Sequence, residues 1–434
     1  GSLFDIDQVE IFKGPQSSIN GPNSLAGQIN LTSKKPTSFF TGDAQLSLGN
    51  DNMKSICLAL GGPILNSLSF RLAIQQSFQN GFRKNKFYNR TDTNKKDEFN
   101  FRAKIKWKIS PKLIAELTNL NANLNNGYDI WAVDNNDEFI TYSDSLGHDS
   151  QQSIANSLKL NLNDFFNTNS FYEYTKSNNE IEHSYDGDWG NDSFWLAGPY
   201  NFNQDSTGWA YSFWDETKRI RERDSHEIRV YSDLSNLSWI IGFYNSNLNE
   251  LDTAKGYLFG GDATDLNSKF LINNNALYAQ ISRNYLLNFT SSINLRVEQN
   301  KTIYNSQGSN WGYPIAEVSD TINQKFLGFR FSTTYSLNKN LNIYSVLSRG
   351  YKIGGINQNP KLSDSNRFFD PEYNTNFEIG SKFRSNKFTL NIAMFNMSRT
   401  DQQVQISSQQ ESGNPNSFTF YTSNATSGWN RGME

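Results

Sequence analysis

Apolar and polar residues alternate along most of the chain from Phe39 onward. The clearest runs lie at residues 99–109, 154–162, 327–335 and 388–394, where nearly every second side chain is apolar. A period of two places one face of a β-strand in an apolar environment and the other face in water. Apolar residues at helical spacing are not sustained in any long stretch of the sequence. The pattern therefore predicts an all-β protein.

Turn signals divide these runs into strands joined by connections of two lengths, which alternate along the chain. The long polar connections are expected at residues 80–96, 125–152, 183–222, 250–273, 302–321 and 353–372. Transmembrane barrels have short turns at one end, long loops at the other, and strands of about ten residues. A soluble sandwich or propeller would show fewer long loops in so regular an order. Counting in this way gives about sixteen strands of a transmembrane barrel.

The composition agrees with a barrel whose lumen is polar. The chain has 434 residues, of which 36% are hydrophobic and 14% aromatic, and its mean hydropathy is −0.65. A disordered chain would lack the aromatic residues, and a helical membrane protein would contain apolar runs of about 18 residues or more. The net charge of −3 provides no basic field for nucleic acid. The single cysteine, Cys57, excludes an intramolecular disulfide and is expected to be buried or to face lipid.

The first tenth of the sequence differs from the alternating remainder. Val9–Gln16 reads Val-Glu-Ile-Phe-Lys-Gly-Pro-Gln, and Ala26–Pro36 reads Ala-Gly-Gln-Ile-Asn-Leu-Thr-Ser-Lys-Lys-Pro. Two later stretches, Ser348–Asn357 and Asp370–Gly380, combine glycine, aromatic and charged residues in a similar way. In this order the four stretches resemble the end of the plug domain and two barrel segments of TonB-dependent outer-membrane receptors. The resemblance covers nearly the whole chain.

Asn20-Gly21 lies between the two plug-like stretches and belongs to the same motif. The residues that carry the resemblance are Glu10, Lys13, Gly14, Pro15, Gly21, Gly27 and Asn30. Two departures from the family pattern occur, because Asn20 replaces an aromatic residue and Ala26-Gly27 replaces Gly-Gly. Gly14, Gly21 and Gly27 are expected to supply backbone freedom for turns. Lys13, Arg102, Lys104 and Lys106 are expected to be polar or ionic partners between plug and wall. Whether Lys13 pairs with Glu372 or with Glu378 is left open.

The resemblance implies a large antiparallel transmembrane β-barrel with a remnant of an N-terminal plug. The family's barrels have 22 strands, so about sixteen strands imply that several are absent. We expect residues 1–38 to be the C-terminal part of the plug domain and residues 39–434 to be the barrel, truncated at its C-terminus. No secretory signal opens the chain. Either the protein is cytoplasmic or the chain is a fragment, and the partial plug motif near residue 9 favours a fragment that lacks both the signal peptide and the upstream TonB box.

By the same resemblance, the protein lies in the outer membrane of a Gram-negative bacterium as a monomer among lipid and lipopolysaccharide. Its partners are TonB, bound through the upstream box by strand addition, and a scarce ligand, with a ferric siderophore as the first choice. Uptake of an oligosaccharide or of cobalamin, and a passive porin or an adhesin barrel, are the alternatives. A secreted all-β carbohydrate-binding or hydrolytic protein is a third interpretation.

The sequence predicts no enzyme, no cofactor and no metal site. His148, His183 and His226 fall in or beside the expected loops without metal-ligand spacing. Aromatic residues crowd the loop expected between positions 184 and 214, and rigid aromatics give contact area at low entropic cost. A loop that packs on itself, or an aromatic girdle at the membrane rim, would account for them equally well. The ligand-binding hypothesis comprises Trp131, Tyr185, Trp189, Trp195, Trp209, Trp214, Arg349 and Tyr351.

This hypothesis is tested by replacing Trp189 and Trp195 with alanine. If the aromatic loop grips the ligand, the double variant loses ligand affinity, because two large contact surfaces are removed. The amount of folded barrel in the outer membrane should stay the same. Unchanged affinity in the double variant would contradict the hypothesis.

Overall fold

The computed structural model describes residues 3–22, 24–82, 84–85, 88–128, 138–139, 147–165, 168–186, 213–258, 261–262, 264–285, 288–310, 312–359, 362–409, 412–413 and 418–434. Within these residues the protein is almost entirely β-structure, in one large antiparallel sheet and three two-stranded sheets. The sequence-based prediction of an all-β fold is confirmed.

Sixteen long strands make up the large sheet in the described part of the chain, as the alternation predicted. They are β3 (Thr41–Gly49), β4 (Met53–Leu65), β5 (Leu68–Gln79), β7 (Lys96–Lys108), β8 (Leu113–Gly127), β10 (His148–Phe165), β11 (Thr168–Asp186), β12 (Phe213–Asp233), β13 (Leu237–Leu258), β15 (Thr264–Tyr285), β16 (Phe289–Asn310), β17 (Tyr313–Asn338), β18 (Leu341–Lys352), β21 (Glu372–Arg384), β22 (Thr389–Gln409) and β23 (Phe418–Met433). The two-residue strand β14 (Gly261–Asp262) pairs with the end of β13.

The remaining elements are small. They are β1 (Ile6–Lys13), α1 (Ser17–Asn20), β2 (Gly27–Ser33), β6 (Lys84–Asn85), β9 (Glu138–Phe139), β19 (Gly355–Ile356), η1 (Asp364–Asn366) and β20 (Phe368–Phe369). No helix in the described residues is long and apolar enough to cross a membrane. The pairs are β1 with β2, β19 with β20, and β6 with β9.

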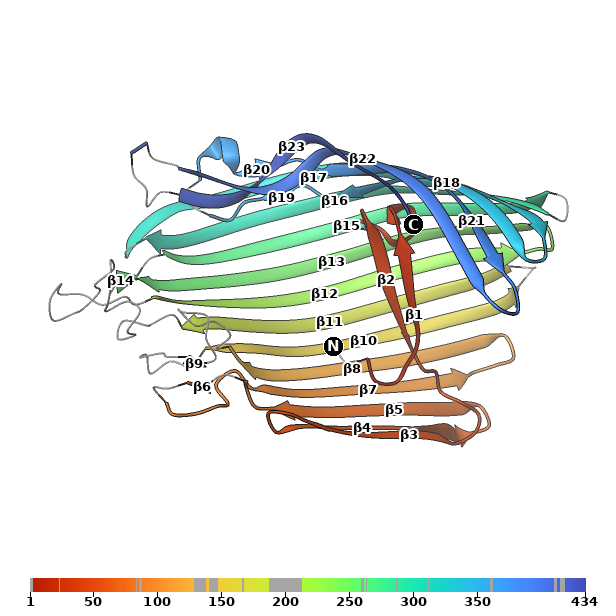
Figure 1. Cartoon of the computed structure of the whole chain (residues 1–434), viewed down its shortest axis with the longest axis horizontal. Helices are drawn as coiled ribbons and strands as arrows, with labels where there is room; N and C mark the ends of the chain where they lie inside the picture. Colours follow the sequence, from red (N-terminus) through yellow and green to blue (C-terminus); the bar gives the residue numbers. More distant parts are fainter. Residues whose placement is uncertain are drawn as a thin grey trace.

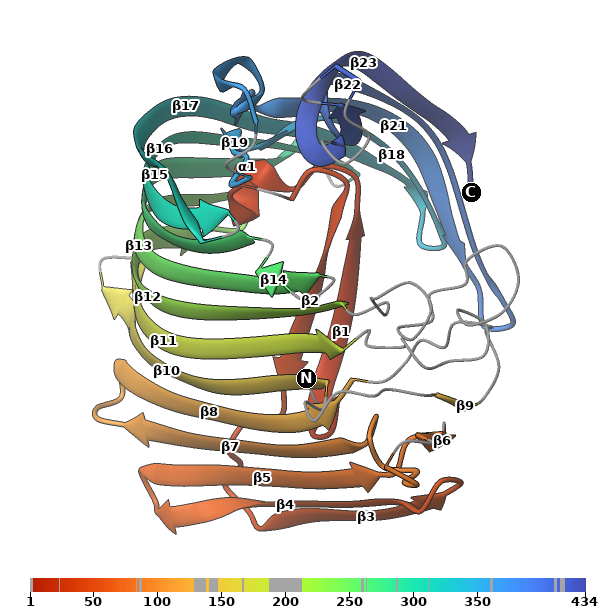
Figure 2. The same cartoon turned by 90° about the vertical axis from the view of Figure 1, so that its left-hand side faces the viewer.

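The large sheet forms a curved wall, because each long strand pairs antiparallel with the next one along the chain. Figure 1 shows the strands lying side by side in chain order, from β3 to β23. The view in Figure 2 shows the wall curling around the β1–β2 hairpin, which stands inside the curve with α1 at one end. The hairpin is therefore surrounded by the wall rather than added to it.

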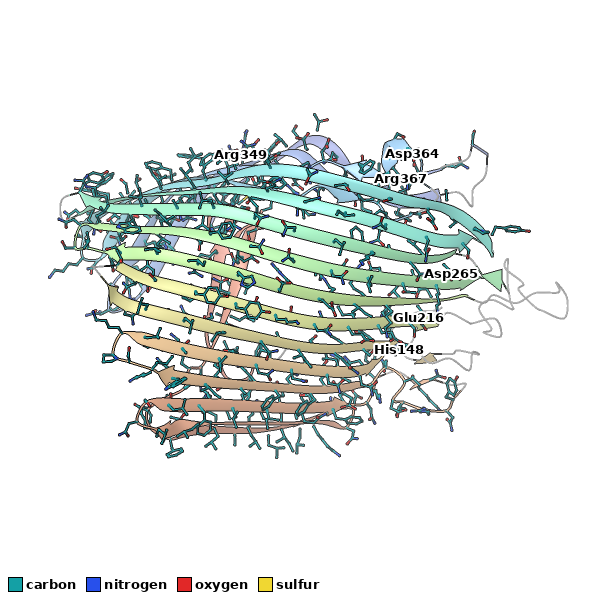
Figure 3. All side chains as sticks on the ribbon, turned by 180° about the vertical axis from the view of Figure 1, so that it is seen from behind. His148, Glu216, Asp265, Arg349, Asp364 and Arg367 are labelled. Carbon is teal, nitrogen blue, oxygen red and sulfur yellow. The ribbon has the colours of Figure 1, made fainter. Side chains whose placement is uncertain are left out.

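Two of the predicted long loops are wrong. Residues 250–273 and 302–321 are mostly strand, because β13 runs to Leu258, β15 begins at Thr264, and β16 and β17 approach each other within two residues. Figure 3 shows His148, Glu216 and Asp265, all from predicted loops, near the strand ends at one rim of the wall. The physical reason is length: β13 has 22 residues, whereas about ten suffice to cross a membrane. Beyond the apolar layer the strands become polar, and the polar sequence resembles that of a loop.

Buried and exposed residues alternate along the strands. Apolar side chains are on the exposed face and polar or small side chains on the buried face, which is the reverse of a soluble protein. On β4, Ser55, Cys57 and Ala59 are buried, whereas the apolar residues Ile56, Leu58 and Leu60 between them are about half exposed. On β16, Ile293, Leu295 and Val297 are exposed, whereas Asn294, Arg296 and Glu298, which alternate with them, are buried. The apolar face therefore points outward and the polar face points into the wall's interior, as lipid on the outside requires.

An ionic cluster fastens the base of the hairpin to the wall. Arg71 of β5 donates from Nε to both carboxylate oxygens of Asp5, at 2.9 and 3.0 Å, and both side chains are at least 96% buried. Arg102 of β7 donates to the Asp5 carbonyl at 3.2 Å, and Lys104 donates to the Ser33 carbonyl at 3.0 Å. Arg102 and Lys104 therefore contact the N-terminal segment, as expected from the sequence.

Two expected partners behave differently. Lys106 lies on the same face of β7 as Arg102 and Lys104, but its Nζ is 3.8 Å from a carboxylate oxygen of Glu116 in the neighbouring wall strand. Lys13 pairs with Glu434, and both side chains are exposed. The two carboxylates left open for Lys13 are occupied elsewhere, because Glu372 pairs with Arg399 and Glu378 accepts a hydrogen bond from Tyr344 at 2.8 Å.

The outward apolar face yields a testable expectation. Leu295→Arg places a charge in the middle of the apolar run of β16 and should lower the free energy of unfolding by about 2–4 kcal/mol in lipid vesicles. The matched control is Gln299→Arg on the same strand and face, just beyond that run, which should cost about 0–1 kcal/mol. Urea titration of the vesicle-inserted protein measures both values. Equal costs at the two positions would contradict the assignment of the lipid face.

A second expectation concerns the Asp5 cluster. Asp5→Ala leaves the buried Arg71 with Asp43 as its carboxylate partner and Thr41 as a neutral one, and should weaken the attachment of the hairpin by about 3 kcal/mol. Chymotrypsin cleavage within the first 40 residues should then accelerate by about two orders of magnitude. Lys34→Gln removes only the exposed pair with Asp43 and serves as the control, since such pairs contribute about 0–1 kcal/mol. If chymotrypsin cleaves the Asp5→Ala hairpin as slowly as the wild-type hairpin, the anchoring role of Asp5 is refuted.

Candidate ligand-binding site

The segment between β1 and β2, residues 14–26, forms the apex of the hairpin and carries α1. Gly14 and Gly21 have φ angles of +75° and +83°, which side chains rarely adopt, so both turns need glycine as expected. Gly27 differs from its expected role, because it lies in β2 opposite Lys13 rather than in a turn. A Cβ there would lie 2.5 Å from the Phe12 carbonyl oxygen, so close strand approach is the reason for this glycine.

The other residues of the plug-like motif lie on the same hairpin. Glu10 and Asn30 are opposite each other on β1 and β2, and Pro15 is fully buried at the apex. A Cβ on Gly350 of the wall would lie 2.9 Å from the Cβ of Pro15. The motif therefore forms one compact unit whose tip rests against the wall.

Hydrogen bonds dock the apex on β17, β18 and β21. The backbone N–H of Tyr351 donates to Ser17 Oγ at 3.1 Å, and Asn374 Nδ2 donates to the Leu25 carbonyl at 2.9 Å. Arg330 Nη1 donates to Gln16 Oε1 at 3.4 Å. These contacts hold the apex at a defined height inside the wall.

Tyr351 forms the wall side of this contact. It is completely buried, its ring stacks on Phe326 with centroids 4.6 Å apart, and its hydroxyl donates to Glu298 at 2.9 Å. Tyr351 therefore lies in β18 against the apex and not in an outer loop. In this structure it supports the apex and is not available to a ligand.

A cavity of about 540 Å³ lies between the apex and the inner face of β12, β13, β15 and β16. Ser18, Ile19 and Pro22 line it from the apex, and Ile353 lines it from the end of β18. The volume falls within the range of about 300–1,000 Å³ typical of small-molecule sites. This cavity is the candidate ligand-binding site, because a molecule inside it contacts both the wall and the hairpin.

The wall of the cavity is unusually rich in arginine and tyrosine. Arg229 binds Glu227 through two hydrogen bonds of 3.0 and 2.8 Å, and the Tyr278 hydroxyl donates to the same carboxylate. The Arg296 guanidinium lies 5.6 Å from the ring centres of both Tyr244 and Tyr278. Cations over aromatic faces at this distance are held electrostatically, so the rings fix the position of Arg296.

Two further arginines come from β12. Arg221 pairs with Glu250 at 2.7 Å, and Arg223 Nη2 donates to the Tyr244 hydroxyl at 2.7 Å. We did not predict these residues, although the sequence contained a signal. Arg219, Arg221 and Arg223 recur at every second position, which places three cations on one face of a strand.

A segment between β18 and β21 folds inward at the same end of the wall. Ile356 packs with Phe270 and Tyr304 in a small apolar cluster. Gln358 donates to Asp252 at 3.2 Å and accepts from Ser268 at 3.0 Å. The segment expected as a long loop at 353–372 therefore lies partly against the inner faces of β13, β15 and β16.

The ligand-binding residues predicted from sequence are not brought together by the described part of the structure. Four of them lie outside the described residues: Trp131, Trp189, Trp195 and Trp209. Tyr185 and Trp214 belong to the paired ends of β11 and β12, opposite Asp215 and Asp186. Arg349, labelled in Figure 3, alternates with the buried Ser348 in β18, and its guanidinium lies 4.5 Å from the centre of the Tyr373 ring. Arg349 thus lies on the outward face and not in an outer loop.

Comparison with solved structures shows the same fold in several receptors, among them the following three. The ferric yersiniabactin uptake receptor FyuA from Yersinia pestis has a TM-score of 0.83 at 16% identity, over 100% of this chain and 63% of FyuA. The siderophore receptor PiuA from Acinetobacter baumannii has a TM-score of 0.77 at 14% identity, over 99% and 66%. The ferripyoverdine receptor of Pseudomonas aeruginosa, bound to ferripyoverdine, has a TM-score of 0.71 at 15% identity, over 99% and 58%. The chain thus spans less than two thirds of these receptors' lengths.

The sequence itself matches the family described as TonB dependent receptor-like, beta-barrel, over residues 110–434. The matched region contains all of the wall from β8 onward, including every strand that lines the cavity. The chain therefore belongs to the TonB-dependent receptor-like β-barrel family, whose members cross the outer membrane of Gram-negative bacteria with their strands.

Proposed function

We propose that this protein is an outer-membrane receptor that takes up a ferric siderophore in a TonB-dependent manner. The observation that carries the proposal is the cavity bounded jointly by the hairpin apex and the wall. A ligand in this cavity contacts the hairpin and changes the hairpin's contacts as it binds. Binding of the ligand is thereby coupled directly to the β1–β2 hairpin inside the barrel. The names of the similar structures, which include a ferric yersiniabactin receptor and a ferripyoverdine receptor, favour an iron chelate.

The same proposal divides the chain into two parts. Residues 1–38 are the C-terminal part of a plug domain, and residues 39–434 are barrel. The separate β1–β2 sheet inside the wall and the start of β3 at Thr41 support this division. Movement of the plug would require the Asp5–Arg71 pair and the Ser17–Tyr351 contact to break, since both join the two parts.

The proposed role is binding and transport without covalent chemistry, so the protein is not an enzyme. TonB is the proposed energy-coupling partner, through addition of a strand from the receptor's N-terminal region. Trp131, Trp189, Trp195 and Trp209 remain proposed ligand contacts. The arginines and tyrosines of the cavity supply charge-assisted hydrogen bonds and aromatic contact, both of which suit a polar chelate.

Binding to the folded chain in detergent tests the proposal. The probes are a ferric tris-catecholate, a ferric trihydroxamate, cobalamin and a maltooligosaccharide, and quenching of tryptophan fluorescence reports binding. We expect at least one ferric chelate to bind with a Kd of about 1 μM or below, and iron-free chelators to bind more weakly. Tight binding of cobalamin or the oligosaccharide, with no binding of either chelate, would overturn the siderophore assignment.

A further inference from the structure

One arginine of the cavity lacks a carboxylate partner among the described residues. Four arginines line the cavity, and three of them form ion pairs: Arg221 with Glu250, Arg229 with Glu227, and Arg296 with Glu298. The fourth is Arg223, whose hydrogen bond goes to the Tyr244 hydroxyl. The charge of Arg223 is therefore the one that the surrounding acids do not neutralise.

The position of Arg223 is set by the aromatic residues around it. Tyr244 accepts a hydrogen bond from one nitrogen of Arg223, and its ring lies 5.6 Å from the guanidinium carbon of Arg296. A guanidinium has five N–H donors in a rigid fork. The contact with Tyr244 orients Arg223 while leaving most of its donors for another group. Arg223 is exposed, and it faces the cavity.

A second unsatisfied group belongs to a residue that lines the cavity from the hairpin side. Ser18, at the apex, is 97% buried, and its hydroxyl has no hydrogen-bond partner in the described part of the protein. Buried hydroxyls are normally paired, because an unpaired one costs about 1–3 kcal/mol. Because Ser18 Oγ has almost no accessible surface in this structure, its hydroxyl would reach a polar atom of a bound molecule by rotation about χ1. The neighbouring Ser17 accepts a hydrogen bond from the backbone of Tyr351, and this contact holds the apex in place against the wall.

We propose that the cavity selects an anionic ferric chelate, with Arg223 pairing with a carboxylate or catecholate oxygen of the ligand and Ser18 donating a hydrogen bond to it. The inference rests on the proposed function and specifies the ligand class. Three of the four lining arginines are paired with glutamates, so the unmatched positive charge of the cavity surface is that of Arg223. Planar guanidinium groups match carboxylates in geometry and form stronger hydrogen bonds with charged acceptors than with neutral ones. An uncharged chelate would leave the charge of Arg223 unmatched.

The test compares two chelates that differ in charge. Binding of a trianionic ferric tris-catecholate and of an uncharged ferric trihydroxamate is measured by tryptophan fluorescence on the whole chain in detergent, at low and at high salt. The wild-type protein should bind the anionic chelate more tightly, and salt should reduce that preference. Arg223→Gln should weaken binding of the anionic chelate by about tenfold or more and change binding of the uncharged one less than about threefold.

Arg219→Gln is the matched control. Arg219 lies on the same face of β12, but it pairs with Asp252 and does not line the cavity, so its loss should leave the preference intact. A heat-dependent shift in electrophoretic mobility confirms that each variant is folded. Ser18→Ala should reduce affinity for the anionic chelate without affecting the apex contact of Ser17.

The outcomes separate the two proposals. If wild-type protein binds the uncharged chelate as tightly as the anionic one, and Arg223→Gln changes neither, the charge selection is wrong while siderophore binding stands. If Arg219→Gln and Arg223→Gln reduce the affinity for the anionic chelate equally, the reduction comes from the overall positive charge of the lumen. The specific role of Arg223 is then refuted. If neither chelate binds but cobalamin or the oligosaccharide does, the siderophore function fails and this inference fails with it.

Discussion

The structure depends on one constraint: in a lipid environment, every backbone N–H and C=O group must find a partner within the protein. The wall meets this constraint through long ladders between neighbouring strands, with local register shifts such as the one between Ser306 and Gly308. The register between β15 and β16 runs from Thr264 opposite Asn310 to Tyr285 opposite Phe289 without a shift. Because the backbone is satisfied by its own ladder, the side chains are free to face lipid on one side and a polar interior on the other.

A polar interior determines how the N-terminal hairpin can be held. The described part of the lumen contains few buried apolar residues, and its small apolar cluster comprises Phe270, Tyr304 and Ile356. The hairpin is instead attached by hydrogen bonds and by the buried pair between Asp5 and Arg71. Such contacts are strong when complete, and the loss of one partner is costly. The attachment is therefore specific and concentrated in a few residues.

The cavity depends on the curvature of the wall as well as on the residues that line it. Strands β12, β13, β15 and β16 are neighbours in the wall, so their inward residues converge on the apex of the hairpin. Arginine and tyrosine side chains from different strands then order one another, as Arg296 does between Tyr244 and Tyr278. The result is a cationic surface in which most charges are paired within the protein and one, on Arg223, is left for a ligand.

The sequence by itself determined the β-class, the outward apolar face and the approximate number of strands, because each rests on local alternation of residues along a strand. It also identified the hairpin motif and two of its wall contacts, Arg102 and Lys104. The strand ends were misjudged at residues 250–273 and 302–321, because strands that leave the membrane lose their apolar face. Only the tertiary structure decided that Tyr351 is buried and that arginines of β12 and β16 share a cavity. Those facts depend on contacts between residues far apart in the chain, which local patterns do not encode.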